Sequence, residues 1–232
     1  MSGGQSSLST VSLPENGTIS FVQLGAYGAQ TLAYGATADG AIAYAHDFYR
    51  VSRGIVGLGR AASSSHGGDD AVIDVGISRK LQLEGWQIVP RAGLSYFHIG
   101  QASFAETGAS SLDLSVGPAA LDALRSRVGV TVSQVLMLGE TRLTPELRAA
   151  WTHDFLDDRD AFGATFAGAP TVSFDQIGAP TGRDAAELGA GISFAISQTT
   201  IPGQLSAFVQ YDATIAAHQT DNAVAAGLKL TW

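Results

Sequence analysis

Cysteine is absent from the 232 residues, which excludes disulfide bonds and thiolate metal sites. Charged residues make up only 15% of the chain, and acidic side chains outnumber basic ones to give a formal net charge of -8 at pH 7. An acidic balance of this kind argues against general binding to nucleic-acid phosphates. The five histidines show no spacing typical of a zinc site, so neither a metal nor another cofactor is expected.

Long hydrophobic runs are missing as well. No apolar stretch approaches the ~18 residues of a transmembrane helix. The first residues, MSGGQSSLSTVSLPENG, have neither the basic nor the apolar region of a secretory signal peptide, and we interpret residues 1–17 as a flexible polar leader. The chain contains 28 glycines and is rather apolar, which leaves two main classes. One is a soluble β-sandwich or barrel, and the other is a transmembrane β-barrel.

What the chain does contain is alternation of apolar and small or polar residues, the signature of β-strands with two different faces. In the C-terminal stretch VAAGLKLTW, one face carries Val224, Ala226, Leu228, Leu230 and Trp232. About nine segments show the pattern, each roughly ten residues long, which is the length of a strand that crosses a bilayer at a tilt. They are residues 18–28, 41–50, 70–80, 86–98, 125–137, 143–155, 185–197, 203–213 and 222–232.

Charges within these segments fall mainly on the small or polar face. In a soluble barrel this face would meet bulk water, whereas in a membrane barrel it lines a wet lumen while the apolar face meets lipid. Two roles are open for such charges: ion pairs that only stabilise the wall, or a polar lining that lets a chain pass. The candidate lumen-lining residues are Asp74, Arg91, Arg127, Glu146, Arg148, Asp212 and Lys229.

The connections between the segments favour the membrane interpretation. Short turns alternate with longer connections, of which residues 51–69, 99–124 and 156–184 are the longest, and SSSHGGDD (63–70) is interpreted as a mobile surface loop. All short turns then lie at one end of the strands, as in outer-membrane barrels with short periplasmic turns and long extracellular loops. Three aromatic residues are expected at the membrane interfaces: Trp86 at a short turn, and Trp151 and Tyr211 toward the outer rim.

Ordered blocks of the sequence are similar to a known family. They are FAETGASSLDLSV (104–116), LRSRVGVTVSQ (124–134), LTPELRAAWTHDFLDD (143–158), FAGAPTVSFDQIGAPTGRDAAELGAGISF (166–194) and the ending AAGLKLTW. Together they resemble the autotransporter β-domain of Gram-negative bacteria, the translocator of type V secretion, from about Phe21 to Trp232. The resemblance implies an outer-membrane pore that supports export of an N-terminal passenger to the cell surface.

The resemblance also implies a fold and partners. The fold is all-β, with residues 18–232 forming an antiparallel meander that is the C-terminal part of a 12-stranded transmembrane barrel. The expected partners are outer-membrane lipid, the barrel-assembly machinery and the passenger. Leu228, Leu230 and Trp232 match the C-terminal insertion signal of the family. Because bacterial single-chain barrels have an even number of strands, we expect about three further strands upstream, and no pairing between 18–28 and 222–232.

Catalytic chemistry is not indicated. In AHDF (45–48) and THDF (152–155) the His and Asp are neighbours on a strand and point to opposite faces. We therefore interpret each pair as a chance neighbourhood or as a placement at the rim, and not as a catalytic dyad. Ser95 and His98 have no orienting acid nearby in sequence. We therefore assign no catalytic residue and expect a transport component rather than an enzyme. The alternatives are an outer-membrane barrel that acts as an adhesin or surface enzyme through its long loops, and a soluble β-barrel binding protein.

Overall fold

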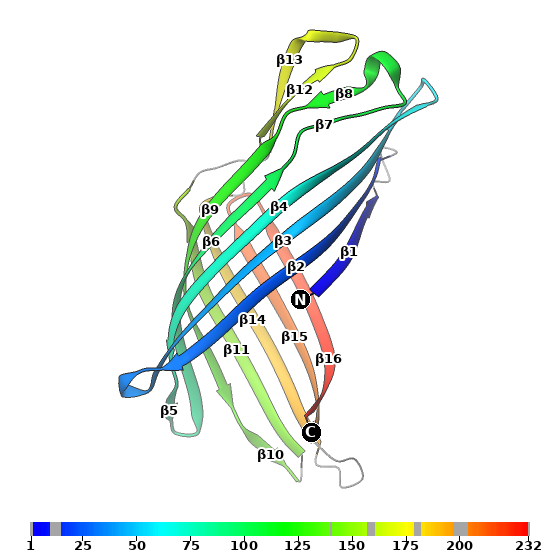
Figure 1. Ribbon diagram of the computed structural model, residues 1–232. Coiled ribbons are helices and arrows are strands. Elements are labelled where there is room, and N and C mark those ends of the chain that lie inside the picture. Colours follow the sequence, from blue (N-terminus) through cyan, green and yellow to red (C-terminus); the bar gives the residue numbers. More distant parts are fainter. Residues whose placement is uncertain are drawn as a thin grey trace.

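The computed structural model describes residues 2–9, 15–139, 141–156, 161–178, 182–196 and 204–231. One large antiparallel sheet of steeply tilted strands curls into a barrel-like wall, with a small second sheet beyond one end (Figure 1). Two single-turn 3-10 helices, η1 (Ala33–Gly35) and η2 (Ser110–Leu112), lie in connections. No helix within the described residues is long and apolar enough to cross a membrane.

The large sheet is a meander in which successive long strands pair antiparallel. Its order is β1 (Ser2–Ser9), β2 (Glu15–Thr31), β3 (Ala36–Ile55), β4 (Arg60–Arg79), β6 (Trp86–Gln101), β9 (Ala119–Gln134), β11 (Thr141–Asp154), β14 (Asp184–Ile196), β15 (Gln204–Ala216) and β16 (Thr220–Thr231). Two short strands, β5 (Leu81–Leu83) and β10 (Leu136–Leu138), extend the hairpins to β6 and β11. All the segments expected from the alternation are strands, and the predicted meander is confirmed.

The polar N-terminal stretch departs from the expectation of a flexible leader over residues 1–17. β1 forms a continuous ladder with β2, from Ser2 opposite Gln23 to Ser9 opposite Asn16. Its sequence, SGGQSSLS, contains Leu8 as its one large apolar residue and therefore shows no hydrophobic alternation. Backbone hydrogen bonds to an existing edge define this strand, and a side-chain pattern cannot reveal it.

A second correction concerns SSSHGGDD (63–70), which is not a loop. These residues are part of β4, and β3 and β4 pair without interruption from Ala36 opposite Arg79 to Ile55 opposite Arg60. Ser, Gly and Asp are uncommon in strands, so the sequence hides the extension. The hairpin therefore extends past the ends of the β4–β6 and β6–β9 ladders, as Figure 1 shows.

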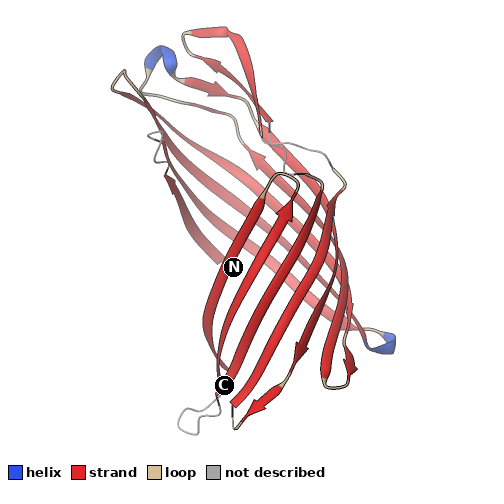
Figure 2. Cartoon of the chain, turned by 180° about the vertical axis from the view of Figure 1, so that it is seen from behind, coloured by secondary structure: helices blue, strands red, loops and turns tan. Residues whose placement is uncertain are grey.

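Beyond the same end of the barrel, the two other long connections form the second sheet. Its order is β13 (Ala169–Ile177), β12 (Ala161–Phe166), β8 (Leu114–Val116) and β7 (Phe104–Ala105). Ser63 of β4 bridges to Thr107, and Arg53 of β3 reaches Glu106, with Nη2 2.5 Å from Oε2. Figure 2 shows this sheet above the wall, with short turns at the opposite end.

The two faces of the large sheet differ as the alternation predicts. The outward face carries exposed aliphatic residues, among them Val128 (54% exposed) and Leu228 (75%), together with Val130 and Phe194, while Val132 and Ile192 are half-buried. The side chain of Leu230 lies outside the described part. Within the described residues no large side chain is fully buried, so the aliphatic residues do not pack into a closed core. This arrangement contradicts the soluble-barrel alternative.

The sheet is open between its first and last strands. β2 lies between β1 and β3, and within the described residues no ladder joins residues 18–28 to 222–232, as expected. β1 and β16 are the two edges. Because each neighbour in the meander reverses direction, these two edge strands run antiparallel to one another.

Candidate functional site

The inward face of the large sheet gathers the charged residues of the strands. Register places the seven candidate residues on this one face: Asp74, Arg91, Arg127, Glu146, Arg148, Asp212 and Lys229. All but Lys229 take part in ion pairs or hydrogen bonds with one another or with further inward side chains. Lys229, opposite Ser206 near the short-turn end, forms no ion pair within the described residues.

Arg91 on β6 holds three strands together. Its guanidinium reaches over β4 to the carboxylate of Asp39 on β3, and its Nη2 lies 3.3 Å from Oδ1 of Asp74 on β4. Asp74 also accepts a hydrogen bond of 2.5 Å from the hydroxyl of Ser95. The guanidinium lies directly over Gly76, where a Cβ atom would collide with it. A glycine at this position is therefore what permits Arg91 to cross β4.

Arg148 on β11 repeats this arrangement on the other side of the wall. Its Nη1 donates to Glu146 at 2.6 Å, and its Nη2 donates to Asp212 on β15 at 2.7 Å. The side chain passes over β14 at Gly189, where a Cβ atom would stand 2.7 Å from Nε of Arg148. Two arginines thus each span an intervening strand through space left by a glycine.

Two further arginines on β9 complete the charged wall. Arg127 donates to Glu187 on β14 at 2.7 Å, across β11. Arg125 makes a bidentate pair with Asp154, with distances of 2.8 and 2.9 Å. Arg125 and the partners Asp39, Asp154 and Glu187 are not among the residues predicted from the sequence, although Glu187 shares the small face of its strand with Gly189. Arg91, Arg125, Arg127 and Arg148 are thus each compensated by a carboxylate within this face.

The sequence-adjacent His–Asp pairs do not form dyads. Each outward histidine instead lies opposite a carboxylate of the next strand: Nδ1 of His46 is 2.9 Å from Asp69, and Nδ1 of His153 is 2.9 Å from Asp184. Ser95 and His98 point to opposite faces, and His98 pairs with Asp122 at 2.8 Å. No cluster that could hold a metal ion occurs in the described part of the chain.

The three aromatic residues expected at the interfaces all lie on the outward face and are exposed. Trp86 begins β6 at the short-turn end, opposite Leu83. Trp151 and Tyr211 lie toward the long-loop end, where the Tyr211 hydroxyl donates to Asn222 at 2.6 Å. Of the expected insertion signal, Leu228 is outward and exposed, the side chain of Leu230 is not described, and Trp232 lies outside the described residues.

Comparison with known proteins agrees with this architecture. Residues 1–212 match the model of the family described as autotransporter beta-domain. No curated protein sequence matches the chain. The fold is similar to the translocator domain of autotransporter NalP from Neisseria meningitidis, with a TM-score of 0.68 and 18% identity over 92% of this chain and 68% of that one.

The outward aliphatic face, the polar inward face, the loop asymmetry and the family match agree with one another. An autotransporter translocator is an outer-membrane pore, and a passenger is its partner in export. The chain belongs to the autotransporter beta-domain family, the outer-membrane translocators of type V secretion.

Proposed function

We propose that the charged inward face is the wall of the path taken by the exported passenger, and that its paired charges keep this wall from retaining the moving chain. The observation that carries the proposal is the compensation of Arg91, Arg127 and Arg148 by carboxylates on other strands. A free arginine in the wall would attract acidic segments at about 1 kcal/mol for a contact near 4 Å in water. Paired arginines stay polar and hydrated without offering this attraction.

The proposal extends to assembly and placement. Leu228, Leu230 and Trp232 are proposed as the insertion signal read by the barrel-assembly machinery. Trp86 is proposed to mark the periplasmic interface, and Trp151 and Tyr211 the outer one, because amphipathic rings favour the level of the headgroups. Lipid contacts the outward aliphatic face between them. The charged residues keep the wall polar and connect its strands by ion pairs, and we propose no catalytic role for them.

Releasing Arg148 from its partners tests the function of the wall. The double variant Glu146→Gln with Asp212→Asn keeps hydrogen-bond acceptors for Arg148 but leaves its charge uncompensated. In the full-length parent protein, we expect an acidic passenger segment to reach the surface roughly fivefold more slowly, as 1 kcal/mol predicts. A neutral segment of equal length should be exported at the original rate. Surface exposure is measured by protease accessibility on intact cells.

The matched control is Asp122→Asn, which neutralises a carboxylate on the outward face. It should leave the export of both segments unchanged. Heat-modifiable migration on gels confirms that each variant is folded. If the folded double variant exports acidic and neutral segments at equal rates, charge compensation in the wall has no role in export.

A further inference from the structure

The outward face of β2, β3 and β4 changes character in steps along the strands. Register aligns its residues in rows of three, beginning with apolar rows. Read toward the long-loop end, the rows are Ala26–Ile42–Ile73, Leu24–Tyr44–Ala71, Val22–His46–Asp69, Ser20–Phe48–Gly67, Thr18–Arg50–Ser65 and Asn16–Ser52–Ser63. Across these three strands the face therefore passes from aliphatic rows, through rows that contain Tyr44, the His46–Asp69 pair and Phe48, to two wholly polar rows.

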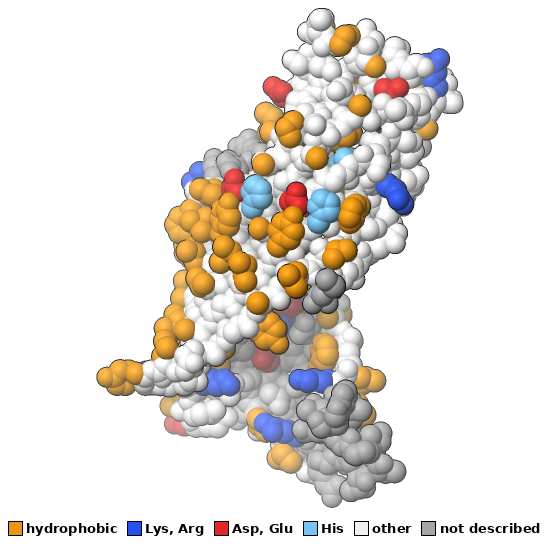
Figure 3. Space-filling model, in the orientation of Figure 1, with side chains coloured by type: hydrophobic (Ala, Val, Ile, Leu, Met, Phe, Trp, Pro, Cys, Tyr) orange, Lys and Arg blue, Asp and Glu red, His pale blue; other side chains and the backbone are white. Residues whose placement is uncertain are grey.

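The His–Asp row recurs around the wall. We call the pairs His46–Asp69, His98–Asp122 and His153–Asp184 the His–Asp tier. Next to each histidine, two residues toward the apolar side, stands an aromatic residue: Tyr44, Tyr96 and Trp151. The hydroxyls of Tyr44 and Tyr96 donate to Asp69 and Asp122, the latter at 2.5 Å. Figure 3 shows histidine and acidic side chains alternating at one level of the surface, above apolar patches.

The tier marks the upper end of the lipid-covered surface. In two of its pairs the carboxylate contacts both a histidine and a tyrosine of the protein. Below the tier, outward positions are apolar from Trp86 to Tyr96 on β6 and from Leu143 to Trp151 on β11. At a strand tilt near 45° these runs span about 21–26 Å, close to the ~25 Å apolar band of an outer-membrane barrel. Headgroups of the outer leaflet therefore begin at this level.

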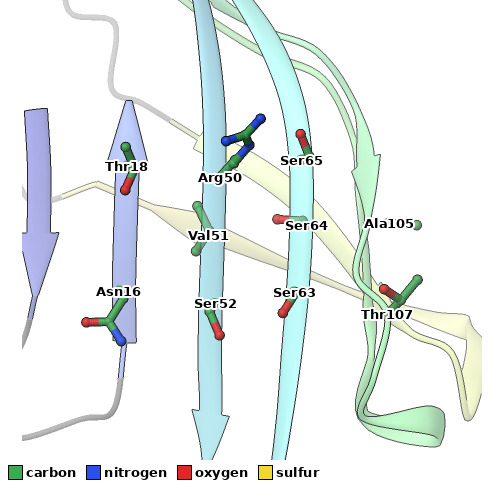
Figure 4. A pocket seen from close by; sticks show the side chains of 10 residues that line it. All are labelled: Asn16, Thr18, Arg50, Val51, Ser52, Ser63, Ser64, Ser65, Ala105 and Thr107. Atoms are coloured by element: carbon green, nitrogen blue, oxygen red, sulfur yellow. The ribbon is translucent and has the colours of Figure 1, made fainter. Parts of the chain in front are cut away.

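A groove that carries several hydroxyl side chains lies above the tier on the β2–β4 face, beyond the row of Ser20, Phe48 and Gly67. It has a volume of about 540 Å³ and is lined mainly by the two uppermost rows, with Ala105 and Thr107 from the loop that bridges to Ser63. Figure 4 shows Arg50 and the hydroxyl side chains of Thr18, Ser52, Ser63 and Ser65 on adjacent strands. Arg50 is four residues beyond His46, or about 13 Å along the strand. The groove is thus at headgroup depth.

Arg50 differs from Arg91, Arg127 and Arg148 in having no ion pair within the described residues. It is exposed, and within the described residues no carboxylate or other hydrogen-bond partner is found for it. Its guanidinium is a planar fork that matches phosphate oxygens in pairs, while the surrounding hydroxyl and amide groups can both donate to and accept from sugar hydroxyls. One free cation within a group of hydroxyls is suited to a phosphorylated saccharide.

We propose that this groove binds the phosphorylated saccharide headgroup of an outer-leaflet lipid, with Arg50 contacting the phosphate. Two observations favour a lipid-borne ligand. The cation complements an anionic headgroup, and the groove lies on the same outward face as the apolar rows below the tier, where acyl chains lie against Leu24, Ile42 and Ile73. The site anchors the projecting β3–β4 hairpin to the leaflet through which the passenger emerges.

Equilibrium binding to the whole chain, folded in lauryldimethylamine oxide micelles, tests the proposal by native mass spectrometry. The probes are lipid A, a phosphorylated diglucosamine lipid, and phosphatidylglycerol, which carries phosphate without a saccharide. We expect lipid A to bind more tightly than phosphatidylglycerol. Arg50→Gln should weaken the binding of lipid A about tenfold, because a charge-assisted hydrogen bond to phosphate is lost.

The matched control is Arg79→Gln, which removes an exposed arginine from the short-turn end of the same strand pair. It should leave the affinity for lipid A unchanged. The double variant Ser52→Ala with Ser65→Ala should reduce the preference for lipid A over phosphatidylglycerol while leaving Arg50 in place. Soluble glucosamine 1-phosphate should compete only weakly, since it has no acyl chains.

Equal loss of lipid A binding in Arg50→Gln and Arg79→Gln would overturn the site, because the effect would then be one of overall charge. Equal affinity for lipid A and phosphatidylglycerol would overturn the saccharide assignment. Soluble glucosamine 1-phosphate binding as tightly as lipid A would show that the ligand is a free sugar phosphate. Arg50→Lys, which keeps the charge without the fork, should give an intermediate affinity.

Discussion

Replacing Leu147 by arginine is expected to prevent insertion of the domain into membranes. Leu147 lies at the middle of the outward face of β11, between Val132 and Ala190 on the neighbouring strands, and is 63% exposed. An arginine facing lipid at the bilayer midplane costs about 2–4 kcal/mol. A cost of this size is a large fraction of the stability of a typical domain, so the folded fraction in vesicles should fall steeply.

The matched control places arginine on the inward face at the same height. Gln210 lies one row away, in register with Gly191 and Glu146. Gln210→Arg puts the new charge in the wet interior beside a carboxylate, and should insert normally. Heat-modifiable migration on gels after refolding into vesicles measures both variants. If Leu147→Arg inserts as well as Gln210→Arg, the outward aliphatic face does not meet lipid.

Deleting Leu228–Trp232 is expected to abolish assembly in the outer membrane. The deleted part of β16 pairs with the start of β15, with Leu228 opposite Ala207 and Leu230 opposite Leu205. Its removal exposes backbone groups of β15 to lipid, at several kcal/mol for each unsatisfied group. The measurement is the amount of heat-modifiable barrel in outer-membrane fractions of cells that produce the parent protein.

A substitution variant distinguishes the loss of backbone pairing between β15 and β16 from the loss of the proposed insertion signal. Changing Leu228, Leu230 and Trp232 to serine keeps the backbone of β16 but removes the apolar face at its end. If the insertion signal is read from these side chains, this variant should fail as completely as the deletion. Normal assembly of the serine variant would contradict the signal, and normal assembly of the deletion would contradict both roles.

The strands that the sequence reveals are those with two different faces. Alternation identifies the segment that contains Ile192 and Phe194 because burial in lipid requires apolar residues on one face and none on the other. The same test fails for β1 and for Ser63–Asp70, where both faces meet water or other polar groups. There the ladder to an existing neighbour defines the strand, and a period-two pattern carries no information about it.

The charged wall was predictable in part. Because successive side chains of a strand point to opposite faces, the alternation alone is sufficient to place Arg91 and Arg148 on the inward face. Their partners depend on the register of three strands at once, and on glycines at the crossing points, Gly76 and Gly189. For the same reason, the pairing of His46 with Asp69 and not with its neighbour Asp47 required the alignment of β3 with β4.

The central claim is that one face of this sheet meets lipid while the other encloses water. Because the chain contains no cysteine, single cysteines can be introduced at the outward positions Val128, Val130 and Val209 and at the inward positions Thr131 and Gln210. After spin labelling in vesicles, outward labels should be relaxed by oxygen and shielded from a water-soluble nickel chelate. Inward labels should show the reverse. Equal accessibility of both sets to the nickel chelate would contradict the membrane barrel.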